Sequence, residues 1–159
     1  MNLKIIGAFA ALLMLGACGD RDTTAGATTG SGATASTAGV TPGSQDDLVA
    51  NVGDRVFFAL DSSSLSGDAR ATLDRQSAWM ARYPQVSIQM GGNCDERGTT
   101  EYNLALGQRR ANAARDYLVA RGVSSARITA VSFGKERPTA LGSDEQAWAQ
   151  NRNGTTSVR

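Results

Sequence analysis

Apolar residues recur with the periods of strands and helices from Leu48 onward and are scarce just before it. Short alternating runs, rich in β-branched and aromatic residues, predict strands. The C-terminal run is short and polar, so we expect it at a sheet edge. The predicted strands are residues 56–58, 86–90, 128–133 and 155–158.

Longer periodic segments between these runs predict helices. Ser66 suits the N-cap of a helix that runs to about Tyr83, where Pro84 ends it. A second helix covers residues 100–121, with Gly122 as its C-terminal cap, and Ser143 suits the cap of a short helix through Trp148. The order βαβαβ(α)β predicts an α+β, two-layer domain over residues 48–159, with one mixed sheet packed against helices.

The long helix carries a stripe of apolar and small residues at helical spacing, which we expect to face the core. The stripe consists of Leu104, Gly107, Ala111, Ala114 and Leu118.

The N-terminus has the pattern of a secretory signal. Lys4 precedes an apolar run over residues 5–15, which is too short to span a bilayer stably. The run closes on Leu-Gly-Ala-Cys, which resembles the bacterial lipobox and predicts a signal peptide over residues 1–17. Cys18 would then carry a diacylglycerol and an N-acyl chain as the lipid anchor. The alternative is an ordinary signal peptide with an incidental cysteine.

A linker rich in Gly, Ala, Ser and Thr follows Cys18 and extends to Asp47. Such a composition buries too little surface to offset chain entropy, so we expect disorder. About 28 residues of this kind span roughly 30 Å on average. We expect a spacer that lets an anchored domain reach away from its membrane.

Charge and residue usage exclude several functions. Sixteen Lys and Arg residues balance fifteen Asp and Glu residues, so the chain has no basic character suited to nucleic acid. Histidine is absent, which removes the commonest general base and zinc ligand and argues against an enzyme or a metal site. With Cys18 assigned to lipid, Cys94 has no disulfide partner. No cofactor is expected apart from the acyl chains.

One segment makes a family resemblance visible. Residues 94–111, CDERGTTEYNLALGQRRA, are similar to the peptidoglycan-associated lipoproteins of the Tol–Pal system, within the OmpA-like C-terminal domain family. Further matches lie in residues 132–138 and 144–152, and the resemblance covers residue 50 to the end. It implies an outer-membrane lipoprotein whose domain faces the periplasm and binds peptidoglycan noncovalently at a diaminopimelate stem peptide. It also implies TolB as a partner and a role in envelope integrity and cell division. In the sorting rule of bacterial lipoproteins, an Asp directly after the cysteine retains the protein in the inner membrane. Gly19 stands at that position here, so the outer membrane is favoured.

Diaminopimelate ends in a zwitterion, so its binding site needs a carboxylate for the ammonium and a guanidinium for the carboxylate. Asp95, on a loop, and Arg110, on the long helix, are candidates for this pair. Replacing either with Ala should remove binding and leave the fold largely intact. The alternative is that Asp95 and Arg110 form a structural ion pair.

The resemblance implies further residues around the same cleft. Arg97 and its neighbour Glu96 remain open among ligand contact, partner contact and solvent, and Arg109 should face away from the site. The residues implied as cleft lining are Phe58, Asn93, Thr99, Asn103, Leu106 and, near the C-terminus, Arg152.

The chain departs from the family pattern at several positions. Ala59 stands where an Asp is common, Gly91 where an acidic or small residue is common, and Asn93 where many members have His. Gly154 and Thr155 replace two apolar residues, which predicts weaker packing of the last strand.

Two other functions are conceivable beside wall binding. A protein adaptor for TolB is compatible with it. A wall hydrolase is disfavoured, because Asp95 and Glu96 are adjacent, and neighbours in sequence seldom place two carboxylates on one scissile bond.

Overall fold

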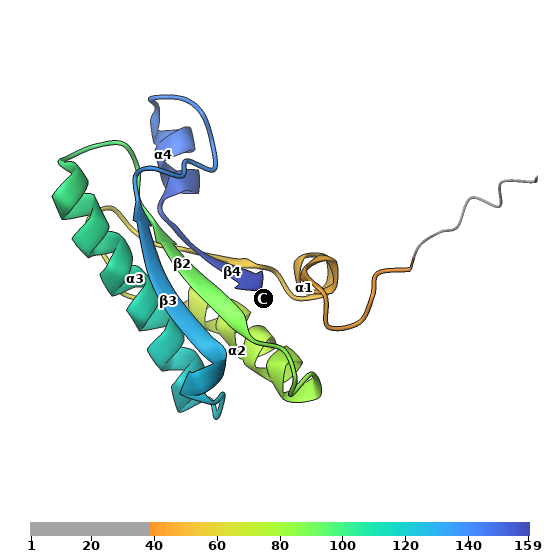
Figure 1. Ribbon diagram of the computed structural model, residues 1–159. Coiled ribbons are helices and arrows are strands. Elements are labelled where there is room, and N and C mark those ends of the chain that lie inside the picture. Colours follow the sequence, from red (N-terminus) through yellow and green to blue (C-terminus); the bar gives the residue numbers. More distant parts are fainter. Residues whose placement is uncertain (1–38) are drawn as a thin grey trace, which may run out of the picture. The chain divides into compact units, whose positions relative to one another are not determined.

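The computed structural model describes residues 39–159. The predicted signal peptide, Cys18 and most of the linker lie outside the described residues. The helices and strands follow one another as α1 (Gln45–Asn51), β1 (Arg55–Phe57), α2 (Gly67–Arg82), β2 (Ile88–Asn93), α3 (Thr100–Ala120), a 3₁₀ turn (Ser125–Arg127), β3 (Ile128–Gly134), α4 (Glu145–Asn151) and β4 (Asn153–Val158). Figure 1 shows this arrangement.

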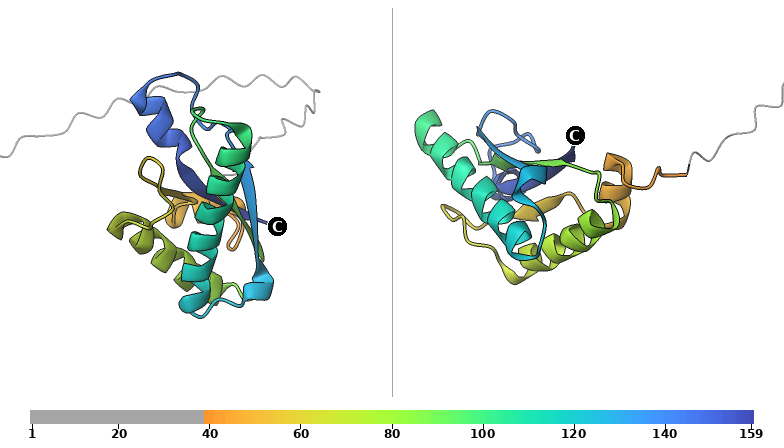
Figure 2. Two further views of the ribbon diagram at one scale, coloured as in Figure 1. Left: turned by 90° about the vertical axis from the view of Figure 1, so that its left-hand side faces the viewer. Right: turned by 60° about the horizontal axis from the view of Figure 1, so that its bottom comes forward.

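The strands of the described chain form one mixed sheet in the order β1-β4-β2-β3. Within it, β2 runs parallel to β3 and antiparallel to β4. The predicted two-layer α+β fold is confirmed, because α2 and α3 lie side by side against the sheet (Figure 2). The edge position predicted for the last strand is wrong. β4 pairs with β1 on one side and β2 on the other, so its polar residues belong to an interior strand.

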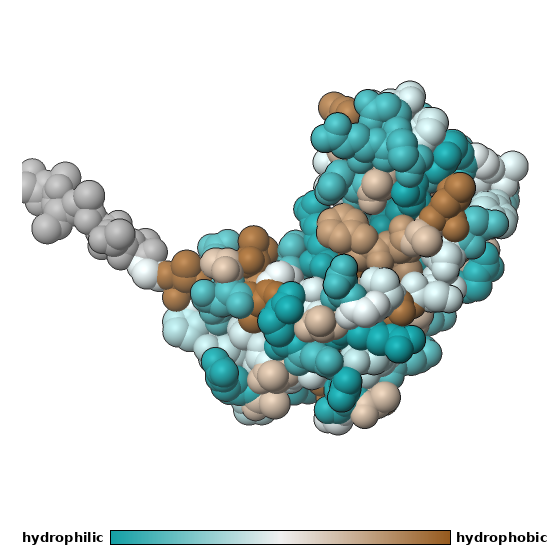
Figure 3. All heavy atoms as spheres, turned by 180° about the vertical axis from the view of Figure 1, so that it is seen from behind, coloured by the Kyte–Doolittle hydropathy of each residue, from teal (hydrophilic) through white to brown (hydrophobic). Residues whose placement is uncertain are grey.

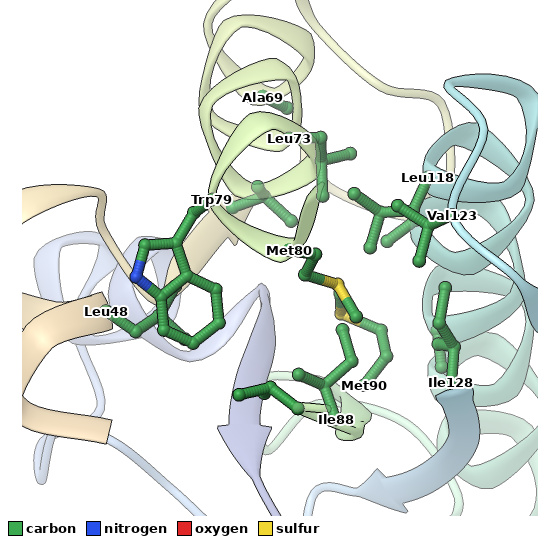
Figure 4. Packing of buried hydrophobic residues seen from close by; sticks show 14 of the residues in the cluster. Leu48, Ala69, Leu73, Trp79, Met80, Ile88, Met90, Leu118, Val123 and Ile128 are labelled. Atoms are coloured by element: carbon green, nitrogen blue, oxygen red, sulfur yellow. The ribbon is translucent and has the colours of Figure 1, made fainter. Parts of the chain in front are cut away.

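The core lies between the sheet and the two long helices. Figure 4 shows Leu48 of α1 next to Trp79 of α2, with Met80, Ile88 and Met90 at the centre. Of the stripe predicted on the long helix, Gly107, Ala111, Ala114 and Leu118 are buried, whereas Leu104 is half exposed.

Helix boundaries follow local capping. Ser66 accepts a hydrogen bond from the Ala69 N–H, as predicted, and Gly122 adopts a positive φ after α3. The short last helix differs from expectation, since its N-cap is Asp144 rather than Ser143 and it extends to Asn151. Within residues 39–159, no helix combines the length and the apolar character that crossing a bilayer requires.

Helix α1 was not predicted, and it begins inside the segment assigned to the linker. Ser44 caps it, and the Asp47 carboxylate accepts hydrogen bonds from Trp79 Nε1 at 2.9 Å and from the Gly43 N–H at 2.8 Å. The Gln45 side chain meets β4, accepting from the Val158 N–H at 2.7 Å. The residues just before Leu48 therefore belong to the domain.

Helix α3 crosses β2 at two glycines. A Cβ added to Gly92 would stand 1.8 Å from the Gly107 carbonyl oxygen, and one added to Gly107 would stand 2.7 Å from the Gly92 carbonyl oxygen. The backbones therefore approach more closely than any side chain permits. Strand β2 extends through Asn93, beyond its predicted end at residue 90, because Gly91 and Gly92 serve close packing rather than a turn.

Candidate binding cleft

A cleft of about 260 Å³ lies where the loop after β2 meets the first half of α3 and the loop before α2. The view from behind shows apolar surface gathered below the mainly hydrophilic region around α4 (Figure 3). The cleft is lined by Leu60, Asp61, Cys94, Asp95, Arg97, Gly98, Tyr102, Asn103, Leu106 and Arg110.

Arg110 forms a buried wall of the cleft. Its guanidinium donates to the carbonyl oxygens of Ser62 at 2.8 Å, Asn93 at 2.8 Å and Ala59 at 3.1 Å, and to Cys94 Sγ at 3.4 Å. A guanidinium has five N–H donors, so one remains without a partner among residues 39–159. Burial lowers the pKa of Arg110, but the group stays charged at neutral pH.

Asp95 lines the same cleft and pairs with two other arginines. Its Oδ2 accepts from Arg97 Nη2 at 2.7 Å and from Arg152 Nη1 at 3.3 Å. Burial acts to raise the pKa of Asp95, but the hydrogen bonds from Arg97 and Arg152 outweigh it and hold the pKa below its ordinary value. Asp95 is therefore an anion in a partly dehydrated wall.

The alternative of a structural ion pair between Asp95 and Arg110 is wrong for this conformation. Among residues 39–159, Asp95 forms salt bridges with Arg97 and Arg152 but not with Arg110. The two residues are brought to one cleft without neutralising each other, which is the arrangement that a zwitterionic ligand needs.

Arg97 lines the cleft and stacks on the last helix. Its guanidinium lies 4.0 Å from the centre of the Trp148 ring of α4, a stacked cation–π contact. Trp148 Nε1 in turn donates to Glu96 Oε1 at 3.1 Å. Helix α4 therefore supports the loop that carries both Asp95 and Arg97.

Some of the predicted site residues line the cleft. They are Asp95, Arg97, Asn103, Leu106 and Arg110. Asn103 also braces the loop, because its Nδ2 donates to the Arg97 carbonyl oxygen at 2.7 Å.

The other predicted site residues lie behind or beside this surface. The Phe58 ring lies 5.3 Å from the Arg110 guanidinium carbon, and Arg152 donates to the Phe58 carbonyl oxygen as well as to Asp95. Thr99 caps α3 through the Tyr102 N–H. The side-chain amide of Asn93 donates to Asn153 of β4, and only the backbone carbonyl oxygen of Asn93 accepts from Arg110. These residues support the cleft rather than line it.

Sequence reasoning missed the cleft residues on the loop before α2 and at the start of α3. Tyr102 precedes Leu106 and Arg110 at spacings of four, so the helix periodicity placed it on the same face. Its hydroxyl donates to the Asp61 carboxylate. Asp61 has a φ of 53°, a conformation that L-residues seldom adopt, and the local sequence gave no comparable signal for it.

The departures from the family pattern have local explanations. Ala59 contributes its carbonyl oxygen to Arg110, and Asp61, two residues later, provides a carboxylate to the cleft. A Cβ at Gly154 would stand 3.0 Å from Val56 Cγ2, so neighbours already fill that space, and the expected weak packing is not supported. Gly91 lies beneath the Phe133 ring, which a Cβ would meet at 2.5 Å.

A mixed sheet with two helices on one face, and a charged cleft between a loop and a helix, defines a small α+β binding domain. A family model described as OmpA family matches residues 57–152. A peptidoglycan-associated lipoprotein of Rhizobium meliloti is 58% identical over 116 residues, which are 73% of this chain and 66% of that protein. One from Mesorhizobium japonicum is 54% identical over 118 residues, 74% of this chain and 70% of that protein.

Solved structures of related domains have a similar fold. The crystal structure of the peptidoglycan-associated lipoprotein from Burkholderia pseudomallei has a TM-score of 0.65 at 47% identity, covering 67% of this chain and 90% of that chain. The C-terminal domain of Helicobacter pylori MotB, at 19% identity and a TM-score of 0.62, shares the fold.

The chain belongs to the OmpA family, in its branch of peptidoglycan-associated lipoproteins. This is a structural family without enzymatic activity, so the wall-hydrolase alternative is set aside.

Proposed function

We propose that this protein is a lipoprotein that binds peptidoglycan noncovalently and links the outer membrane to the cell wall. The cleft receives the zwitterionic end of diaminopimelate in a stem peptide, with the ammonium at Asp95 and the carboxylate at Arg110. The names of the relatives support the class of ligand. The domain faces the periplasm, and the linker connects it to the lipidated Cys18.

One observation carries the proposal. A buried carboxylate and a buried guanidinium line one cleft of about 260 Å³ without pairing to each other. Arg110 has no ionised partner among residues 39–159, and the partner of Asp95 at the cleft surface, Arg97, is partly exposed, so a ligand that carries the complementary pair of charges suits this cavity. The spare N–H of Arg110 provides a donor for the ligand's carboxylate.

The test is sedimentation with purified sacculi. The protein should move to the pellet, and free meso-diaminopimelate should return it to the supernatant. Asp95→Asn keeps the side-chain shape and removes the charge, so it should lose most of the binding. A protein that stays in the supernatant with intact sacculi contradicts the proposal.

The anchor is part of the same proposal. Cys18 carries the acyl chains, so Cys18→Ser should give an unlipidated protein that leaves the membrane fraction. Metabolic labelling with a fatty acid reports the modification directly. Acyl labelling that persists in the variant would show that Cys18 is not the lipidated residue.

We also propose TolB as a protein partner, within the Tol–Pal system that supports envelope integrity and constriction during division. Leu60 and Tyr102 on the cleft wall are 59% and 44% exposed, which supports a protein contact that overlaps the ligand site. TolB and sacculi should then compete. If both bind one protein molecule together, the sites are separate.

A further inference from the structure

The Asp95 carboxylate is fully occupied before any ligand arrives. An ionised carboxylate has about four acceptor positions. Within residues 39–159, Oδ1 accepts from the Arg97 backbone N–H and from Arg97 Nε, both at 3.2 Å. Oδ2 accepts from Arg97 Nη2 at 2.7 Å and from Arg152 Nη1 at 3.3 Å. An ammonium that enters the cleft meets no vacant acceptor on Asp95.

The two arginines differ in how firmly they are held. The Arg152 side chain is 9% exposed, and it also bonds to the Phe58 carbonyl oxygen and to Glu145. The Arg97 side chain is 35% exposed and lines the cleft. Its further contact is the face of Trp148, which imposes no fixed hydrogen-bond direction. Arg97 is therefore the guanidinium that can leave Asp95.

We infer that Arg97 determines the ligand specificity of the cleft, because it is the resident counter-ion of Asp95 and the ligand's ammonium takes its place. The inference rests on the proposed function, and it adds an exchange of one cation for another. A ligand without an ammonium cannot compensate Asp95 for the loss of Arg97, so it leaves that pair closed.

Electrostatics favours the exchange over simple addition. With Arg97 in place, an added ammonium would join three guanidinium groups, those of Arg97, Arg110 and Arg152, around the cleft. Like charges brought this close in a partly dehydrated site repel each other strongly. The released Arg97 stays under the influence of the Glu96 and Glu145 carboxylates, which both act on its charge. The Arg97 guanidinium therefore still has acidic groups nearby after it leaves Asp95.

The experiment titrates the mature full-length protein with free meso-diaminopimelate and with pimelate, which has the two carboxylates and no ammonium. Affinity is measured by calorimetry for the wild type, for Arg97→Ala and for Arg115→Ala. Arg115 is a matched control, because it is also 35% exposed and pairs with an acid, Asp116, at 2.7 Å. Thermal unfolding checks that each variant is folded.

Arg97→Ala should bind diaminopimelate at least threefold more tightly than the wild type, whereas Arg115→Ala should stay within twofold. In the wild type, the ¹⁵Nε–H resonance of Arg97 should shift with diaminopimelate and remain in place with pimelate. The resonance measurement does not depend on the stability of any variant.

Weaker or unchanged diaminopimelate binding by a folded Arg97→Ala protein overturns the inference, and so does an Arg97 resonance that stays in place while the wild type binds. In either case the proposed function stands, because the wild type still binds. A wild type that binds no diaminopimelate overturns both.

Discussion

Arg110→Ala should destabilise the fold as well as remove ligand binding, contrary to the expectation from sequence that the fold stays intact. The side chain is 1% exposed, and its guanidinium joins the carbonyl oxygens of Ala59, Ser62 and Asn93. These carbonyls belong to the loop before α2 and to the end of β2, so one side chain holds two walls of the cleft together.

The magnitude follows from the carbonyls left behind. A buried acceptor that loses its partner costs about 1–3 kcal/mol, and removing the Arg110 side chain opens these carbonyls to the adjoining cleft, so we take the low end. Three such groups give a loss of about 3 kcal/mol in the free energy of unfolding. This is a large part of the roughly 5–15 kcal/mol that stabilises a typical domain, but it leaves a folded majority.

Urea unfolding followed by circular dichroism measures this loss. Arg109→Ala is the control, because Arg109 is its exposed neighbour on α3 and should change stability by less than about 0.5 kcal/mol. If Arg110→Ala unfolds at the urea midpoint of the wild type with the same slope, the bonds to the three carbonyls contribute nothing, and the structural role assigned to Arg110 is wrong.

Three further predictions concern the scaffold and its charges. A chain starting at residue 39 should be as stable as the mature protein, whereas one starting at Leu48 loses the bonds of Asp47 to Trp79 and of Gln45 to β4, and should melt several degrees lower by calorimetry. Gly92→Ala should leave little soluble folded protein, because its Cβ would overlap the Gly107 carbonyl; a normal melting curve would contradict that close approach. The pKa of Asp95 is lowered in the fold, so its stabilisation is present above about pH 3.9 and is lost as the pH falls below that value. The stability gap between wild type and Asp95→Asn should therefore narrow in acid, and a gap that is constant with pH would contradict the assignment.

Much of the fold was predictable because strand and helix periods are local properties. The cap at Ser66 and the buried face of α3 follow from single residues and their spacing. The interior position of β4 was not predictable in this way. Its polar residues suggest an edge, but Thr156 donates to Gln76 of α2 at 2.9 Å, and Asn153 accepts from Asn93 at 2.8 Å. These polar side chains form hydrogen bonds with residues distant in sequence, and a local sequence pattern does not identify such partners.

The membership of the cleft was predictable in part, and the ion pairs within it were not. Helical spacing placed Asn103, Leu106 and Arg110 on one face, and all three line the cleft. The partner of Asp95 could not be inferred, because Arg97, Arg110 and Arg152 are all near it by resemblance. Tertiary contacts decide the outcome: the Arg110 guanidinium donates to backbone carbonyls, whereas those of Arg97 and Arg152 reach the Asp95 carboxylate.

Backbone ¹H–¹⁵N chemical shifts measured with and without meso-diaminopimelate test most directly whether the zwitterion binds in this cleft. Saturating ligand should move the resonances of Asp95, Asn103, Leu106 and Arg110, while those of the groove between α1 and α2, at Asn51 and Arg82, stay in place. Shifts concentrated in that groove, or no shifts at all, would contradict the claim that this cleft reads the zwitterion.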